Sequence, residues 1–238
     1  EPLAWPVIIS PTGASKLFHA EGEGAVARAS GKFNMPYSLS TVGTTSIEDI
    51  AAIGDHPKMF QIYVFRDRTL TRDLVQRCKD AKYTALCLTV DTPVAGNRER
   101  DSYYGMMATA KPALRSVPSM LRHPGWLYRA VIRKDMELVN VTKALSSMKF
   151  TDMSVKDFID SQFDRSLTWK DVEWLADLWG GPLVIKGVQT VADCRKAADA
   201  GGTAVMLSNH GGRQLEGAPA PVDCVAAVAD ALRDRLEI

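Results

Sequence analysis

The sequence predicts an α/β fold of the (β/α)8 TIM barrel type, and three observations predict it. Short apolar runs alternate with helical patterns along most of the chain, which is typical of a parallel sheet covered by helices. Polar residues gather at the C-terminal ends of successive apolar runs, which favours a barrel over a doubly wound sheet with a single switch point. With 238 residues, of which 46% are hydrophobic and 24% charged, the chain can bury a sizeable core.

Each expected element follows from its apolar run or from its start and stop signals. Strands are expected over residues 5–10, 36–41, 59–65, 84–91, 183–187 and 203–209. Helices are expected over residues 21–30, 46–53, 69–81, 168–179, 190–200 and 221–236. Ser46, Thr168 and Thr190 each stand shortly before an acidic residue, as helix N-caps do. Gly201 provides a stop signal after residue 200.

Residues 92–167 interrupt this alternation, and we expect them to form a long loop after the fourth strand, within a single domain 1–238. The rest of the chain provides about six strand–helix units, whereas a closed barrel of eight units typically takes about 250 residues. A seventh strand should begin near residue 235, where the sequence stops. The sequence is therefore expected to be a truncated barrel, incomplete at both ends, or one that a partner chain completes.

Part of this loop is basic and amphipathic. Residues 102–134 contain six Lys or Arg residues, no Asp or Glu, and interleaved apolar and aromatic residues. Such a segment is typical of peripheral contact with a membrane surface. The alternative is a lid whose apolar residues pack over the barrel mouth and whose arginines face solvent. The sequence leaves both interpretations open.

The composition argues against several other classes of protein. A net charge of +1 indicates no nucleic-acid partner, and no apolar run approaches the roughly 18 residues that span a bilayer. Residues 1–5 lack the basic start of a secretory signal. The four cysteines lack metal-type spacing, so we expect no metal site and reduced thiols in the cytoplasm. His19, His56 and His123 are expected at the surface.

The most informative segment is residues 205–215, where an apolar run leads directly into a glycine-rich turn that carries His210 and Arg213. An imidazole is suited to proton transfer near neutral pH. A guanidinium binds a carboxylate through two parallel hydrogen bonds. The two residues together suggest a site that holds a small carboxylic acid and removes a proton beside its carboxylate. The alternative is a polar loop in which His210 caps the next helix.

Other strand ends carry polar residues that converge with this turn. Residues two apart on a strand share a face, so pairs at several strand ends can point into one common space. These pairs are Gln61 with Tyr63, Thr89 with Asp91, and Ser208 with His210. Lys186 is the polar residue at the end of the strand expected over 183–187. A structural role is the alternative to a functional one at these positions: Asp91 could start a turn, Tyr63 could be a half-buried core aromatic, and Lys186 could be a solvated lysine.

Residues 208–215, SNHGGRQL, match the signature of the FMN-dependent 2-hydroxy-acid oxidising family, which includes L-lactate dehydrogenase, mandelate dehydrogenase and glycolate oxidase. Supporting matches occur in family order at residues 11–13 (PTG), 39–41 (LST), 60–63 (FQIY), 88–93 (LTVDTP), 167–171 (LTWKD) and 184–187 (VIKG). The chain therefore resembles this family from its first residues to its last. Only the long loop matches weakly.

The resemblance implies a role for each matched residue. His210 would be the base that takes a proton from the substrate, and Asp91 would stabilise its imidazolium. Substrate would be bound by Arg213, Tyr63 and a second arginine, Arg98. Lys186 would lie beside N1 and O2 of the flavin of FMN. The remaining expected cofactor contacts are Thr12, Gly13, Ser40, Gln61, Thr89 and Ser208.

The resemblance also implies a substrate and an electron acceptor. The reaction would oxidise an (S)-2-hydroxy acid to a 2-oxo acid, with L-lactate first and mandelate or a longer acid second. Val42 stands where glycolate oxidase has tryptophan, which implies different room for the substrate side chain. Gly13 stands where oxidases of the family commonly carry alanine, which favours a dehydrogenase that passes electrons to quinone or another carrier. We expect a homo-oligomer in the cytoplasm, peripheral on the inner face of the cell membrane if the basic loop binds it.

The sequence is also compatible with three alternatives to this function. They are an oxidase that uses oxygen, a different phosphate- or flavin-binding barrel such as an isomerase, and a truncated paralogue without activity. The family's first active-site tyrosine precedes the segments matched in this sequence, and its FMN-phosphate motifs lie beyond Ile238. The sequence as it stands is therefore expected to bind FMN poorly.

Overall fold

The computed structural model describes residues 5–93, 96, 99, 103, 116–133, 135–142 and 161–238. The chain divides into two compact units. The first unit comprises Glu1–His56 with Arg98–Gln162, and the second comprises Pro57–Asn97 with Phe163–Ile238. The second unit contains most of the predicted strand ends.

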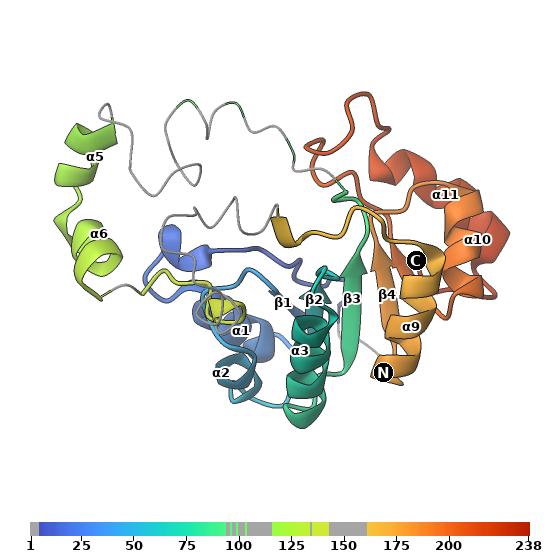
Figure 1. Cartoon of the computed structure of the whole chain (residues 1–238), viewed down its shortest axis with the longest axis horizontal. Helices are drawn as coiled ribbons and strands as arrows, with labels where there is room; N and C mark the ends of the chain where they lie inside the picture. The colour runs from blue at the N-terminus through green and yellow to red at the C-terminus, as the bar shows by residue number, and fades with distance from the viewer. Residues whose placement is uncertain are drawn as a thin grey trace. The chain divides into compact units, whose positions relative to one another are not determined.

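The second unit is a parallel sheet whose strands alternate with helices along the chain (Figure 1). Its elements are β2 Lys58–Ile62, α3 Arg68–Asp80, β3 Ala85–Thr89, α9 Trp169–Trp179, β4 Leu183–Lys186, α10 Val191–Asp199, β5 Ala204–Met206 and α11 Pro221–Leu232. β2 pairs with β3, β3 with β4 and β4 with β5, all parallel. Each strand thus lies beside the next strand in the sequence, which is the winding of a (β/α)8 barrel.

The strands of the second unit are buried, and their two faces carry different residues. Phe60, Leu86, Leu88 and Ile185 lie on one face and are almost completely buried. The other face carries buried polar residues near the strand ends, namely Gln61, Thr89 and Lys186. Because alternate residues of a strand point to opposite faces, the apolar face meets the covering helices and the polar face lies on the barrel's interior side.

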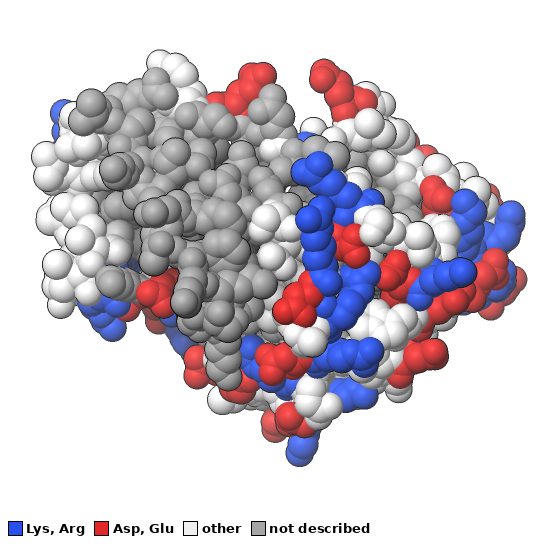
Figure 2. All heavy atoms as spheres, in the orientation of Figure 1, with Lys and Arg blue, Asp and Glu red and all other residues white. Residues whose placement is uncertain are grey.

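The register brings these polar strand ends to one level. Thr89 of β3 stands opposite Lys186 of β4, and Lys186 stands opposite Met206 of β5. The next residues after these positions are therefore neighbours at the same edge of the sheet. Figure 2 shows Lys and Arg side chains interspersed with Asp and Glu on the face that carries α3 and α9.

Within its described residues, the first unit contains one strand and several helices. They are the short helix η1 Ser15–Leu17, α1 Gly22–Lys32, β1 Tyr37–Ser40, α2 Ile47–Ala51, α5 Val117–Leu121, α6 Pro124–Leu127 and the π-helical turn η3 Tyr128–Arg133. Asn140 fixes the start of α2: its Oδ1 accepts a hydrogen bond from the N–H of Ile47 at 3.1 Å, and its Nδ2 donates to the carbonyl of Thr45 at 3.1 Å.

The structure confirms the predicted helices and all but the first predicted strand. Over the described part of residues 5–10, regular pairing is limited to a single parallel bridge between Ile9 and Tyr37. Pro6 and Pro11 have no backbone N–H to donate, which explains why this segment forms no regular strand. The last helix ends at Leu232, and Glu237 then forms a parallel bridge with Ala204 of β5, where a further strand was expected to begin.

One predicted surface residue is buried. His56 is only 9% exposed, whereas His19 and His123 are exposed as expected. The reason is a close approach to α1, because a Cβ at Gly31 would lie 2.8 Å from Nδ1 of His56. The glycine leaves the space that the imidazole fills. The expected long loop falls partly outside the described residues, and its described part contains α5, α6 and η3.

Candidate active site

The site is centred on an imidazole–carboxylate pair in the second unit. Asp91 lies two residues beyond the end of β3, and His210 lies four residues beyond the end of β5. His210 Nδ1 lies 2.9 Å from Asp91 Oδ1, and the two side chains are 22% and 9% exposed. The structure thus brings these two predicted site residues together across 119 positions of sequence.

The backbone holds His210 in an uncommon conformation. His210, Gly211 and Gly212 have φ values of 57°, 69° and 71°, so three successive residues are left-handed. For a residue with a Cβ, this conformation costs on the order of 1–3 kcal/mol and persists only where the surroundings impose it. Ser208 Oγ accepts the N–H of His210 at 3.0 Å, and Asn209 Oδ1 accepts the N–H of Gly212 at 3.1 Å. The turn therefore fixes the imidazole towards Asp91.

A buried cation lies on the other side of Asp91. Lys186 ends β4 and is 8% exposed. Its Nζ lies 4.0 Å from Asp91 Oδ2 and 3.3 Å from Ser208 Oγ. Among the described residues, Asp91 Oδ2 has no hydrogen-bond partner. The carboxylate thus lies between an imidazole and an ammonium group.

A glycine makes this position of Asp91 possible. Gly187 has a φ of 106°, and a Cβ there would lie 2.7 Å from both Cβ and Cγ of Asp91. Gln214 also holds Asp91, because its Nε2 donates to the Asp91 carbonyl at 2.9 Å. Sequence reasoning assigned no role to either residue, although Gly187 belongs to the VIKG match and Gln214 to the SNHGGRQL match.

Two further predicted residues meet inside the sheet. Gln61 Nε2 donates to Thr89 Oγ1 at 3.0 Å, and both side chains are buried. Cys87 stands opposite Gln61 in the register of β2 and β3. Burial raises the pKa of its thiol to about 12, and the positive charge of Lys186 opposes this rise. Cys87 therefore remains a neutral thiol at physiological pH.

Tyr63 lies just beyond β2 and lines a cavity of about 210 Å³ in the second unit. Thr89, Thr92, Pro93 and Phe163 line the same cavity. Phe163 packs against the Tyr63 ring, with ring centroids 4.6 Å apart. Sequence reasoning did not select Phe163, because residues 163–166 carried no strand or helix signal beside a strand end.

The remaining predicted residues are not drawn into this cluster. Arg213 is exposed, and its Nη1 donates weakly to the carbonyl of His210 at 3.4 Å. Arg98 lies outside the described residues. Thr12, Gly13 and Ser40 belong to the first unit, where Ser40 is the last residue of β1 and its Oγ accepts the N–H of Val42 at 3.3 Å.

The segments that carry these three residues are held together by a buried carboxylate. Glu23 of α1 has no exposed surface. Its oxygens accept hydrogen bonds from the N–H of Ser15 at 3.0 Å, the N–H of Thr44 at 2.9 Å and the hydroxyls of Thr44 and Thr45 at 2.6 and 2.9 Å. Burial alone would raise the pKa of Glu23, but the hydrogen bonds from Thr44 and Ser15 lower it overall. Glu23 is therefore a fixed anion that joins two loops of the first unit.

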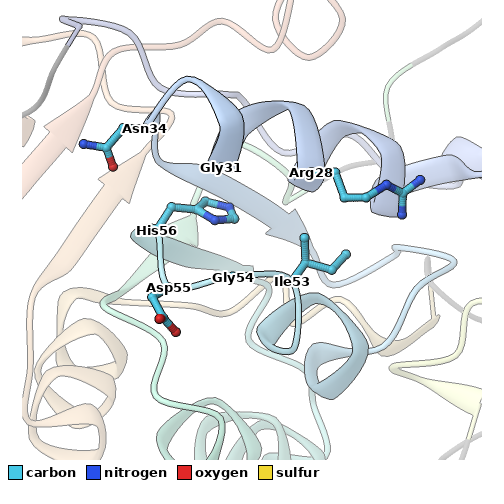
Figure 3. A pocket seen from close by; sticks show the side chains of 7 residues that line it. All are labelled: Arg28, Gly31, Asn34, Ile53, Gly54, Asp55 and His56. Carbon is cyan, nitrogen blue, oxygen red and sulfur yellow. The ribbon is translucent and has the colours of Figure 1, made fainter.

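A larger cavity of about 450 Å³ lies in the first unit (Figure 3). Arg28, Asn34, Ile53, Asp55 and His56 line it together with Gly31 and Gly54. None of the residues predicted for the site lines this cavity, and Arg28 already forms an ion pair with Glu21 at 2.6 Å. Size alone therefore does not identify the functional site, since of these two cavities the smaller is the one that predicted site residues, Tyr63 and Thr89, line.

Known proteins resemble the whole of this sequence. L-lactate dehydrogenases from Xanthomonas campestris pv. campestris (strain B100) and Pseudomonas aeruginosa (strain LESB58) are each 37% identical to it over 242 residues, covering 100% of this chain. The chain spans 61% and 62% of the length of these two relatives.

Solved structures agree with this relationship. The monotopic membrane protein (S)-mandelate dehydrogenase superimposes with a TM-score of 0.84 at 32% identity, covering 96% of this chain and 60% of that one. Mandelate oxidase with (S)-4-hydroxymandelic acid has a TM-score of 0.79 at 32% identity, covering 99% of this chain and 59% of that one. A model of the FMN-dependent dehydrogenase family matches residues 1–238. The chain, with its α/β fold of barrel type, therefore belongs to the FMN-dependent dehydrogenase family.

Proposed function

We propose that the protein oxidises an (S)-2-hydroxy acid to the 2-oxo acid, with L-lactate as the first candidate substrate and mandelate as the second. The observation that carries this proposal is the 2.9 Å contact between His210 and Asp91 at the ends of parallel strands, beside buried Lys186. The L-lactate dehydrogenases that match the whole chain support lactate, and the mandelate dehydrogenase and mandelate oxidase support an aromatic 2-hydroxy acid.

The residues of the second unit fit the FMN on which the family depends. The buried ammonium of Lys186, the Gln61–Thr89 hydrogen bond and Ser208 offer donors and acceptors on one face of the sheet. A flavin ring presents both kinds of group at its edge, so we assign these four residues to hold it. When bound, FMN supplies a two-electron acceptor. Thr12, Gly13 and Ser40 of the first unit remain predicted contacts.

His210 has the geometry of a proton acceptor. When Nδ1 donates its hydrogen to Asp91 Oδ1, the neutral imidazole carries its lone pair on Nε2. Nε2 then accepts a proton from the substrate, and the carboxylate of Asp91 stabilises the imidazolium that results. Lys186 balances the charge of Asp91 from the other side, at 4.0 Å. The strained backbone at His210 fixes the ring before the substrate arrives, which reduces the cost of orientation.

The substrate carboxylate requires a cation that is not already paired with an acid. Lys186 lies beside Asp91, whereas Arg213 is exposed three residues after His210, and its guanidinium bonds the carbonyl of that residue rather than a carboxylate. We therefore assign the substrate carboxylate to Arg213, with Tyr63 as a hydrogen-bond partner and Arg98 as a second cation. Tyr63 is suited to this because it lines the cavity.

Gly13 bears on the electron acceptor. We assign quinone or another carrier, because oxidases of the family commonly carry alanine where this chain has glycine. A Cβ at Gly13 would lie 2.6 Å from Cγ2 of Val42 in the first unit, so this chain's own packing also favours glycine. An oxidase that uses oxygen is the second candidate, supported by the mandelate oxidase neighbour.

His210→Gln tests the proposed function directly. In a barrel of full family length loaded with FMN, we expect this variant to retain flavin and to lose the reduction of flavin by L-lactate or mandelate by at least about a hundredfold. His19→Gln, at an exposed histidine, is the matched control and should leave the rate unchanged. Reduction of His210→Gln at the wild-type rate would contradict the assignment of the base, and absence of reduction by any 2-hydroxy acid in the wild type would contradict the function.

We further propose that α5, α6 and η3 contact a membrane surface. Leu121 and Ile132 are 65% and 67% exposed, and Tyr128 and Val131 are exposed beside them. The surface over α5 and α6 is mostly uncharged, with Lys and Arg at its margins (Figure 2). No helix in the described part of the chain is long and apolar enough to cross a bilayer. A monotopic membrane protein among the structural neighbours supports contact without crossing.

Sedimentation with vesicles tests this contact. Changing Leu121 and Ile132 together to Ser should weaken binding to vesicles of phosphatidylcholine with phosphatidylglycerol by about tenfold, since each exposed apolar side chain adds to the buried area. Val222→Ser is the control, because Val222 is also highly exposed but lies on α11 of the second unit. Equal binding by the double variant and the control would favour the lid interpretation.

A further inference from the structure

The ring of Phe163 packs against a residue assigned to substrate binding. The ring centroids of Phe163 and Tyr63 are 4.6 Å apart and the planes are tilted by 39°. Phe65 lies on the same aromatic cluster, with its centroid 6.4 Å from that of Phe163. Phe163 and Phe65 also form an antiparallel backbone bridge. The backbone of Phe163 is therefore fixed to the residues that follow β2, and its ring forms one wall beside Tyr63.

A single guanidinium fixes the segment that carries Phe163. Nη2 of Arg68 lies 2.7 Å from Asp164 Oδ2 and 2.7 Å from Asp171 Oδ1, and Nη1 donates to the carbonyl of Phe65 at 2.6 Å. The same group lies over the ring of Trp174, 5.6 Å from its centroid. Arg68 thus joins the start of α3, the residues after β2 and the first turn of α9. Only a planar fork with several donors can make all of these contacts at once.

The two carboxylates are themselves fixed by local hydrogen bonds. Asp164 accepts the N–H and the hydroxyl of Ser166 at 3.0 and 2.6 Å. The hydrogen bond from Ser166 and, to a smaller degree, Arg68 hold the pKa of Asp164 below its usual range against the effect of burial. Asp171 accepts the N–H of Thr168 at 2.8 Å in a capping box at the start of α9. Arg68 therefore binds two carboxylates whose positions are already set.

We infer that Phe163 and Arg68 are positioning residues for Tyr63. Arg68 holds residues 163–171 in place, and the ring of Phe163 keeps the ring of Tyr63 at the wall of the 210 Å³ cavity that Phe163 and Tyr63 both line. Without this wall, the tyrosine ring gains rotational freedom that substrate binding must remove again. This inference rests on the proposed function, in which Tyr63 hydrogen-bonds the substrate.

The inference predicts that Phe163 acts through the Tyr63 hydroxyl. Phe163→Leu and Arg68→Lys should each lower kcat/KM for the reduction of bound flavin by L-lactate by about tenfold, in the FMN-loaded protein. In a Tyr63→Phe background, which already lacks the hydroxyl, the same changes should lower it by less than about twofold. Phe163→Met is a second variant of similar volume for use if Phe163→Leu does not fold.

Matched controls separate this role from general destabilisation. Phe33→Leu changes an exposed phenylalanine, and Arg77→Lys changes an arginine on the same helix as Arg68 whose carboxylate partner Asp73 lies 3.9 Å away. Both controls should leave kcat/KM unchanged in either background. Equal losses for Phe163→Leu in the wild-type and Tyr63→Phe backgrounds would overturn the inference, since a structural role does not depend on the hydroxyl.

A readout that needs no activity separates this inference from the proposed function. With 3-fluorotyrosine incorporated at the tyrosines, the ¹⁹F resonance assigned through Tyr63→Phe should relax as that of a fixed ring in the wild type and as that of a more mobile ring in Phe163→Leu. The relaxation rate is the readout, because loss of the Phe163 ring current shifts the resonance in either case. If no 2-hydroxy acid reduces the bound flavin, the proposed function fails and the resonance alone decides the positioning role. An equal ¹⁹F relaxation rate in the wild type and in Phe163→Leu would overturn it.

Discussion

Gly187→Ala tests whether the position of Asp91 depends on a missing Cβ. A Cβ there would lie 2.7 Å from Asp91 Cβ and Cγ and 3.0 Å from its nitrogen, too close for the carboxylate to stay in place. The φ of 106° adds a conformational cost of about 1–2 kcal/mol for any residue with a Cβ. Overpacking against Asp91 adds about 1–3 kcal/mol. We therefore expect the free energy of unfolding to fall by about 2–5 kcal/mol, within the typical stability of a folded domain.

Gly180→Ala isolates the steric part of this effect. Gly180 has a φ of 68° at the end of α9, and a Cβ there would have no neighbour within 4 Å. Its substitution should therefore cost only the conformational part, about 1–2 kcal/mol. Urea unfolding of both variants gives the difference. If Gly187→Ala is no more destabilising than Gly180→Ala, the contact with Asp91 does not constrain the glycine and the reasoning is refuted.

The same substitution should affect the chemistry if the proposed function holds. Movement of Asp91 weakens its 2.9 Å contact with His210, and a hydrogen bond between charged partners contributes about 1.5–3 kcal/mol. We therefore expect flavin reduction to slow by about tenfold to a hundredfold in Gly187→Ala and to remain unchanged in Gly180→Ala.

Two further predictions concern the first unit. Glu23→Gln should destabilise the protein by about 1–3 kcal/mol near pH 7, because it removes a charged acceptor of four hydrogen bonds. The pKa of Glu23 is lower in the folded protein than its unfolded value of 4.5, so the stabilisation by this carboxylate is fully present above pH 4.5 and is lost as the pH falls through the folded pKa. The free energies of unfolding of wild type and variant, measured in urea, should therefore converge in acid. A difference that stays constant with pH would contradict this. Gly13→Ala should destabilise by about 1–3 kcal/mol because its Cβ meets Val42, and combination with Val42→Ala should restore stability. If Gly13 also limits the use of oxygen, stopped-flow mixing should show that the reduced double variant reacts faster with oxygen than the wild type; an equal rate would contradict that role.

Local signals predicted most of the secondary structure. Thr190 Oγ1 accepts the N–H of Asp193 at 3.0 Å, and Thr168 forms a capping box with Asp171, as their spacing indicated. These caps depend on residues three positions apart, so a sequence contains all the information needed. Contacts between distant segments left no such signal. The burial of His56 depends on the absence of a side chain at Gly31, 25 positions earlier in the sequence, and the sequence alone does not bring the two together.

The site was predictable to the extent that the sheet positions it. Thr89 and Lys186 stand opposite each other in the register, and Asp91 follows Thr89 by two residues, so a parallel sheet alone brings Asp91 near Lys186. The position of His210 depends on more than the sheet, because its left-handed backbone is held by the hydrogen bond that its N–H donates to Ser208 Oγ and by the hydrogen bond from Gly212 N–H to Asn209 Oδ1. Gln214 reaches Asp91 across 123 positions, and no periodicity marks such a contact.

The distance from the sheet also explains why the position of Arg213, the cation assigned to the substrate carboxylate, is less fixed than the position of His210, the proton acceptor. Each residue between the last strand position and a side chain adds two backbone angles that the sheet does not set. His210 is four residues beyond β5, but its ring is held by Asp91, whereas Arg213 is seven residues beyond β5 and bonds the carbonyl of its own turn. Gly211 and Gly212, both left-handed, lie between them. Because a bound carboxylate would give Arg213 a charged partner, substrate binding should order this arginine, whereas the orientation of His210 is already set without it.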